Sequence, residues 1–408
     1  MKKFTCLLAL LIIGGEGLLF GGTAADEKIT MAFESNPLEA GWIGVRKHYR
    51  PFDGEVVQDL QNHKNHFLAI RRGSLESPVL RCAEGQIYKL TCRTQTRNPG
   101  FWRVFFYKKT GEEIQADNYS RLYAHKKQWQ KQTFFFEGRH AADFMKLGFD
   151  KLGGRQLNLD DIVLRPATNA EALKWMDSLS AGLPPVQYEP SPDRWKYLGH
   201  TVRKLVGHQK MRIVILGDSI ANDTANSLFH LEVERLYPGC DITLVRSVRS
   251  GTGCRYYRRN NHVEEYVLRY RPDLLMIAGI SNGNDPRAVR DVIRKTRKQQ
   301  TPDILVLSGA VTPFAPREYY ENGERIFISA KERKRQNEKF REELREMCAK
   351  EKVAFLDMRA IWEDYLASSP KPRGWYQRDP VHSNSRGKRV LGEILVRYFS
   401  NAELPQAP

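Results

Sequence analysis

The sequence has little that would suit a membrane protein or a metalloprotein. After the first residues no apolar run is long enough to cross a bilayer, and no CxxC pair or cysteine–histidine cluster has zinc spacing. No low-complexity tract interrupts the chain, whose composition of 41% hydrophobic and 11% aromatic residues is typical of globular proteins. At 408 residues the chain exceeds one ordinary core, so we expect two domains. Because no cluster has metal-ligand spacing, we expect no metal, and we expect no cofactor.

The N-terminus has the pattern of an export signal. Two lysines precede an apolar run over residues 7–20, and small residues follow at 23–25. We therefore predict a signal peptide over residues 1–25 and an exported protein, which is periplasmic, cell-surface or secreted. The alternative is a retained N-terminal anchor. Cys6 precedes the apolar run, which argues against a lipoprotein cleavage box.

Removal of this signal leaves an odd number of cysteines: Cys82, Cys92, Cys240, Cys254 and Cys348. Cys82 and Cys92 flank a candidate hairpin, so a disulfide between them is one interpretation. For the last three, buried free thiols are the favoured interpretation.

The formal net charge of +17 raises the question of nucleic acid. No nucleic-acid motif accompanies the charge, and export would keep the protein away from such partners. We therefore expect no nucleic-acid partner. Arginines recur at helical spacing within residues 285–298, which is typical of a solvated helix face. Attraction to an acidic polysaccharide or an anionic cell surface is the functional alternative.

Residues 26–168 have the texture of an all-β domain. Short aromatic and β-branched runs alternate with turn residues, as in 86–92, 102–107, 132–136 and 158–164. The last of these runs, Asn158–Leu164, resembles the closing strand of a galactose-binding-like jelly roll, as found in carbohydrate-binding modules. The resemblance implies a β-sandwich that binds carbohydrate. For Asp160 and Asp161 we favour a strand end over a calcium site.

Residues 169–207 contain one helical piece, 171–180, followed by four prolines, and we predict a linker with a short helix there. Residues 208–402 then alternate apolar strands with amphipathic helices. The expected strands are 212–216, 241–246, 273–278, 303–308 and 353–357, and a final helix begins near Ser385. This pattern predicts a parallel sheet covered on both faces, with ligands at the carboxyl ends of its strands.

Polar residues stand at these strand ends. Ser219 follows the first strand and begins a helix, where free N–H groups favour a developing negative charge. Gly251 follows the second strand and Asn282 the third, and both residue types donate hydrogen bonds to an oxyanion in known enzymes. Each alone is more typical of a helix cap or a turn.

Asp379 and His382 stand before the final helix, three residues apart. A serine nucleophile needs a base, and a histidine base needs a carboxylate that fixes its tautomer. Together with Ser219 these residues form a candidate catalytic triad. No Gly-x-Ser-x-Gly elbow occurs, which argues against an ordinary α/β-hydrolase.

The blocks Gly217–Ser219, Ser250–Gly251, Gly279–Asn282 and Asp379–His382 resemble those of SGNH/GDSL hydrolases. The resemblance implies a flavodoxin-like five-stranded sheet, Ser219 as nucleophile, His382 as base and Asp379 as its orienting carboxylate. It also implies an oxyanion hole made by Ser219, Gly251 and Asn282. The family's usual Gly-x-Asn-Asp is absent here, and we choose Asn282 over Asn284 from the strand count.

These features predict an exported serine esterase that removes O-acyl groups, O-acetyl above all, from a polysaccharide or glycan. A lipase, lysophospholipase or thioesterase of the same fold is one alternative, and a non-catalytic glycan-binding protein is another. Lipid substrates need an apolar cleft, whereas Arg249 and Arg255 near the candidate site are basic. We assign these two arginines as candidate substrate-binding residues, with an ordinary solvated surface as the alternative.

Overall fold

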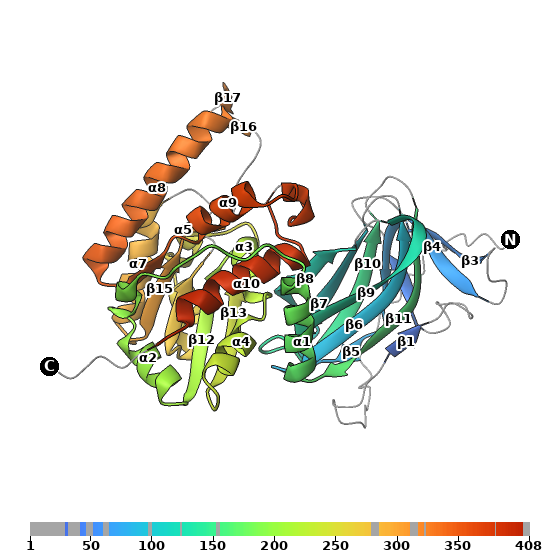
Figure 1. The fold of residues 1–408 in the computed structure, drawn as a ribbon, viewed down its shortest axis with the longest axis horizontal. Coiled ribbons are helices and arrows are strands. Elements are labelled where there is room, and N and C mark those ends of the chain that lie inside the picture. The colour runs from blue at the N-terminus through green and yellow to red at the C-terminus, as the bar shows by residue number, and fades with distance from the viewer. Residues whose placement is uncertain are drawn as a thin grey trace. The chain divides into compact units, whose positions relative to one another are not determined.

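A computed structural model divides the chain into two compact units, Met1–Thr168 and Asn169–Pro408 (Figure 1). The structure describes residues 29–31, 41–45, 52–59, 65–96, 100–122, 125–151, 156–278, 285–310, 317–321, 324–379 and 381–402. The predicted signal peptide lies outside these residues. Within them no helix is both long and apolar enough to cross a membrane.

The first unit is built from antiparallel strands, as predicted for an all-β domain. They are β1 (Ile29–Met31), β2 (Ile43–Val45), β3 (Asp53–Gln58), β4 (His66–Glu76), β5 (Leu80–Arg81), β6 (Ile87–Thr96), β7 (Phe101–Tyr107), β8 (Glu113–Arg121), β9 (His125–Glu137), β10 (Phe144–Lys151) and β11 (Leu157–Ala167). Their main path runs β8-β7-β10-β4-β11-β6-β9.

Strand β4 joins the two halves of this curled sheet. Its first part pairs with β11 at Leu68–Ile70, and its last part pairs with β10 at Gly73–Glu76. Gly73 lies between these parts with φ +88°, and a Cβ there would come within 2.7 Å of the Phe52 backbone. A side chain at this position would therefore be strained by both conformation and space.

Large aromatic side chains fill the interior of the first unit, where the Trp102 ring lies tilted against those of Phe134 and Phe136 at centroid distances of 4.9 and 6.1 Å. Such rings bury the large areas that a sheet core needs. Cys82 and Cys92 are both buried and both free, so the disulfide interpretation is wrong here.

The acidic pair in β11 lies inside the strand rather than at its end. The pairing of β11 with β6 shifts between Asp160 and Val163, which marks a β-bulge. Asp160 is buried and accepts hydrogen bonds from the Asn65 side chain and the Asp161 N–H. Among the described residues no cluster of acids, histidines and cysteines suits a metal ion.

The second unit contains the predicted parallel sheet. Its strands are β12 (Lys210–Gly217), β13 (Asp241–Val248), β14 (Leu274–Ile277), β15 (Asp303–Leu307) and β18 (Ala354–Leu356), in the spatial order β13-β12-β14-β15-β18. This is the flavodoxin-like order 2-1-3-4-5, which reverses between β12 and β14. The predicted fold class, a multidomain chain with an antiparallel β unit and a five-stranded parallel sheet, is thus confirmed.

Helices cover this sheet. They are α1 (Asn169–Ser180), α2 (Gly199–Val206), α3 (Ser219–Ala225), α4 (Phe229–Leu236), α5 (Cys254–Tyr257), α6 (His262–Tyr266), α7 (Pro286–Arg297), α8 (Ala330–Glu351), α9 (Met358–Ser368) and α10 (Ser385–Phe399). Short 3₁₀ turns are η1 (Pro192–Trp195), η2 (Leu268–Tyr270) and η3 (Arg373–Trp375). Cys240, Cys254 and Cys348 are buried free thiols.

Two features of this unit differ from the expected layout. Residues 169–207, predicted as a linker, belong to the second compact unit, and Ala172 and Met176 of α1 are buried in it. A hairpin of β16 (Arg317–Glu321) and β17 (Glu324–Ile328) separates β15 from α8. α8 carries the hairpin away from the sheet, as Figure 1 shows.

Candidate active site

Ser219 is the first residue of α3, directly after the last residues of β12. The preceding Asp218 caps this helix, because its carboxylate accepts hydrogen bonds from Ile220 N at 2.9 Å and Ala221 N at 3.4 Å. The strand therefore stops and the helix starts within two residues. This places the serine at the switch point of the sheet, where ligands bind in such folds.

His382 and Asp379 lie in the loop before α10. The Asp379 carboxylate accepts from the backbone N–H groups of Val381 and His382, both at 2.8 Å, so the loop closes on itself. The imidazole Nδ1 lies 3.0 Å from Asp379 Oδ1 and 2.9 Å from Oδ2. This contact fixes the ring's orientation and leaves Nε2 pointing away from the carboxylate.

The structure brings the three predicted residues together, since His382 Nε2 lies 2.8 Å from Ser219 Oγ across 163 residues of sequence. Burial tends to raise the pKa of Asp379, but the hydrogen bonds and charge of His382 lower it to about 2. The carboxylate is therefore ionised at neutral pH. Such an acid–base–nucleophile chain can activate a hydroxyl for attack.

Asp223 and Arg378 hold this loop against the serine helix, and the sequence patterns did not single them out. Asp223, one turn after Ser219 on α3, is 2% exposed and accepts from the Arg378 side chain at 2.7 Å. Its other oxygen accepts from Ser383 N, next to His382, at 2.9 Å. One buried carboxylate thus ties the nucleophile helix to the loop of the acid and the base.

The loop is also fixed at its far end by Asn384. Its side-chain oxygen accepts from Arg386 N and Gly387 N at the start of α10, while its amide donates to Trp375 O at 2.9 Å. An Asn before a helical pattern was the available sequence signal for this cap. The role of Asp223 needs tertiary contacts that no local spacing reveals.

Gly251 lies in the turn after β13 with φ +70°, and Arg249 N of the same turn donates to Gly217 O at 3.0 Å. Tyr257 of α5 donates its hydroxyl hydrogen to the same carbonyl at 2.6 Å, so this turn is anchored beside the end of β12. Within the described part of the chain, the N–H groups of Ser219 and Gly251 donate to no protein acceptor. Both remain available to a ligand oxygen. Asn282 and Asn284 lie outside the described residues.

Asp218 is an unusual neighbour for the serine, because this acidic residue is only 1% exposed. Burial raises its pKa to about 6, although the hydrogen bonds from Ile220 and Ala221 and the nearby His382 act in the opposite direction. The Asp218 carboxylate that caps α3 therefore becomes protonated as pH falls through about 6.

The candidate substrate-binding arginines have protein partners. Arg255 binds the Asp285 carboxylate at 3.1 Å rather than Glu264 or Glu265, the acids nearest in sequence. Arg249 lies over the Tyr256 ring at 5.0 Å. Both arginines remain close in sequence to Gly251, but their contacts also fit a structural role.

No protein-family model matches the chain, and no curated protein matches it. Among solved structures, the enzymatically active domain of tailspike protein 4 from bacteriophage CBA120 is 8% identical, with a TM-score of 0.29 over 33% of this chain. The chain covers only 20% of that structure.

Two esterase structures match a larger share of the chain. A catalytic mutant of an acetylxylan esterase from Geobacillus stearothermophilus is 16% identical over 48% of this chain and 97% of its own, with a TM-score of 0.37. A two-domain esterase active on acetylated mannans is 16% identical over 52% of this chain and 56% of its own, with a TM-score of 0.39. Similarity at this level says nothing about the substrate of this chain.

Proposed function

We propose that the second unit is a serine esterase of the SGNH/GDSL type that removes O-acetyl groups from a carbohydrate. The observation that carries this proposal is the hydrogen-bonded chain from Asp379 through His382 to Ser219 Oγ. In this chain each group has the partner that its role requires, and the carboxylate is ionised.

Hydrolysis then takes two steps. In the first, Ser219 Oγ attacks the acetyl carbonyl while His382 Nε2 accepts its proton. The bond between the acetyl carbon and the sugar oxygen then breaks, and His382 gives the proton to that oxygen, so that the sugar leaves with a free hydroxyl. In the second, His382 deprotonates a water molecule that attacks the acyl-serine, and acetic acid and free Ser219 result. Asp379 stabilises the imidazolium that forms in both steps.

The negative oxygen of each tetrahedral intermediate needs hydrogen-bond donors. The N–H groups of Ser219 and Gly251 are without protein acceptors in the described structure and belong to the turns that end β12 and β13. We assign the oxyanion to these two groups and to the Asn282 side chain. One such donor contributes about 3–4 kcal/mol to catalysis in known enzymes.

A carbohydrate substrate fits the surroundings of the serine better than a lipid. Arg249 and Arg255 follow the second strand, and Asp379 lies in the loop before α10. A lipase or thioesterase would need apolar side chains in these positions to hold a long acyl chain. Export, which would bring the enzyme to polysaccharides outside the cell, is part of the same proposal.

The test is hydrolysis by purified protein of a short-chain aryl ester, acetylated xylan, acetylated mannan and acyl esters of graded length. Ser219→Ala should lower kcat by several orders of magnitude without moving the thermal midpoint. Ser178→Ala, which changes an exposed serine on α1 of the same unit, is the matched control. Activity of Ser219→Ala within about tenfold of the parent would refute the mechanism. Preference for long acyl chains would refute the choice of acetyl groups but not the serine mechanism.

A further inference from the structure

The second unit has a pocket at the edge of the sheet opposite the serine. Asp273 directly precedes β14, Asp303 begins β15 and Lys352 precedes β18, so the pocket lies where these parallel strands start. Ser219 follows the end of β12, at the other edge. The pocket has a volume of about 890 Å³, within the range of pockets that hold small organic ligands.

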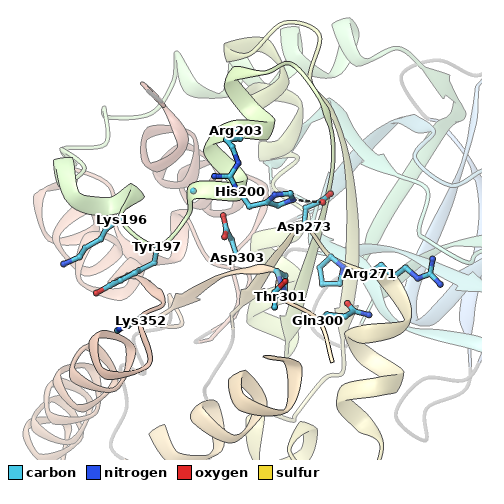
Figure 2. A pocket seen from close by; sticks show the side chains of 13 residues that line it. Lys196, Tyr197, His200, Arg203, Arg271, Asp273, Gln300, Thr301, Asp303 and Lys352 are labelled. Carbon is cyan, nitrogen blue, oxygen red and sulfur yellow. Dashed lines mark hydrogen bonds and ion pairs between the residues drawn. The ribbon is translucent and has the colours of Figure 1, made fainter. Parts of the chain in front are cut away.

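Four cationic side chains surround this pocket: Lys196, Arg203, Arg271 and Lys352. They come from four separate segments, and Figure 2 shows Lys196 on one side and Arg271 on the other, with Arg203 between them at the rim. None of the four forms an ion pair with an acid of the described residues, and all four are exposed.

The two acids of the pocket are already bound by the protein. Asp303 accepts from Thr201 N at the start of α2 at 2.6 Å. Asp273 accepts from His200 Nε2 at 3.0 Å, as Figure 2 shows, and its other oxygen accepts from Arg212 N at 2.8 Å. Lys204 lies 3.3 Å from the same carboxylate. Neither acid therefore forms an ion pair with any of the four cations.

The backbone at two of these cations supports a role beyond a charged surface. Arg271 ends η2 with φ +49° and Lys352 ends α8 with φ +52°, both in the left-handed region. Glycine is the residue that such helix ends favour, because a Cβ strains this conformation. Both positions carry a long cation instead, and both cations line the same pocket.

Flat and polar groups complete the lining. The half-buried Tyr197 ring and the buried prolines at 272 and 302 also line the pocket. Lys196 Nζ lies 5.5 Å from the centre of the Tyr197 ring. Ring faces beside planar guanidinium groups match a sugar ring that carries carboxylate or sulfate groups.

We infer that this pocket binds an acidic oligosaccharide segment through its uronate or sulfate groups. The anion site stands on the pocket itself, and the choice of a glycan rests on the proposed function. Bound there, a polysaccharide chain would be retained by one edge of the sheet while the other edge acts on its acetyl groups. Because the cations are exposed, the affinity should fall as salt rises.

Calorimetric titration with tetragalacturonate tests the inference, with a neutral mannotetraose, a sulfated oligosaccharide and inorganic phosphate as comparisons. The parent protein should bind at least one of the anionic oligosaccharides about tenfold or more tightly than the neutral one. The double variant Arg271→Gly/Lys352→Gly should lose that preference while its thermal midpoint stays the same or rises, since glycine suits both backbones. A lowered midpoint with unchanged binding would contradict both the anion site and the expected relief of backbone strain.

The double variant Lys174→Gln/Arg287→Gln removes the same charge from exposed helix positions outside the pocket and should keep the preference. Arg203→Gln is a second pocket variant that leaves the two helix ends intact and should also weaken binding. Equal binding by parent and pocket variants, or phosphate binding as tight as that of the oligosaccharides, would overturn the inference. Hydrolysis of an aryl acetate reports separately on Ser219, so failure of the esterase and failure of this pocket are distinguishable.

Discussion

The two edges of the parallel sheet in the second unit differ in whether their charged side chains have partners of opposite charge. At the carboxyl edge the charges are bound to each other: the pair of Asp223 with Arg378 is buried, and the pair of Asp379 with His382 is partly exposed. At the amino edge Arg203, Arg271 and Lys352 are exposed and lack acidic partners within the described residues. The charges at the carboxyl edge are thus paired, whereas these three cations of the amino edge are not paired with acids.

The difference follows from what each edge must do. A buried charge pair tolerates little displacement, because separating its members leaves an uncompensated charge away from water. Such pairs keep the serine, the imidazole and the carboxylate in one arrangement. Exposed cations fix no arrangement, but they stay free to bind an anion that arrives from solution. The following predictions test this contrast, from the largest expected effect to the smallest.

The largest effect is expected at the acid of the triad. Asp379→Asn should lower kcat by about 10⁴, because the amide can no longer select the imidazole tautomer that accepts the serine proton. Initial rates with an aryl acetate measure this loss. Asp364→Asn, an exposed acid on α9, should change little. If the two variants retain similar activity, the charges of the carboxyl edge are not catalytic.

A smaller effect is expected at the oxyanion site. Asn282→Ala should lower kcat by roughly 10²–10³, the size of one lost oxyanion donor, and Asn284→Ala should do far less. The same rate measurement compares them. If Asn284 is the more sensitive residue, the oxyanion donor is Asn284 and the assignment of Asn282 is wrong by two residues.

The pH dependence of stability should expose the buried carboxyl of Asp218. Its pKa is raised from 3.8 to about 6, so the folded state binds its proton more tightly than the unfolded state does. The stability that this group contributes is present below pH 4 and is lost as pH rises to 6, by about 3 kcal/mol. Asp218→Asn keeps a capping side chain but cannot titrate.

Denaturant unfolding of both proteins between pH 4 and 7 measures this effect. The variant should gain stability relative to the parent as pH rises. A constant difference between the two proteins would show that Asp218 titrates normally.

The smallest effect is expected at the positioning carboxylate. Asp223→Asn should lower kcat about tenfold with KM nearly unchanged, because the loop of His382 loses its tie to the serine helix while the substrate surface stays intact. The exposed Asp241→Asn is the matched control. Since the variant loses a buried ion pair, circular dichroism must show that it is folded. A folded variant with parental kcat would remove Asp223 from the account.

Much of this arrangement was predictable because it is local in sequence. Alternating apolar strands and helices predicted all five parallel strands, and Ser219, Asp379 and His382 were chosen from their places at strand and helix ends. The bonds of Asp223 to Arg378 and Ser383 join residues 155 and 160 positions apart, so no local pattern reports them. Arg271 and Lys352 are also far apart in the sequence, so their approach to one pocket could not be predicted from a local pattern.

Two expectations failed for a related reason. Proline content predicted a linker over 169–207, but the apolar face of α1 packs into the second unit, and tertiary burial decided its place. Asp160 and Asp161 were expected at a strand end, yet a β-bulge accommodates them inside β11. Packing and register shifts of this kind depend on partners far away in the sequence.

Reaction of the folded protein with a fluorophosphonate probe, followed by peptide mapping, tests the central claim most directly. Ser219 Oγ should attack phosphorus and expel fluoride, because His382 accepts its proton at 2.8 Å. The account predicts an adduct on the peptide that contains Ser219, and its loss in His382→Ala. A folded protein that forms no adduct, or forms it on another serine, would contradict the account.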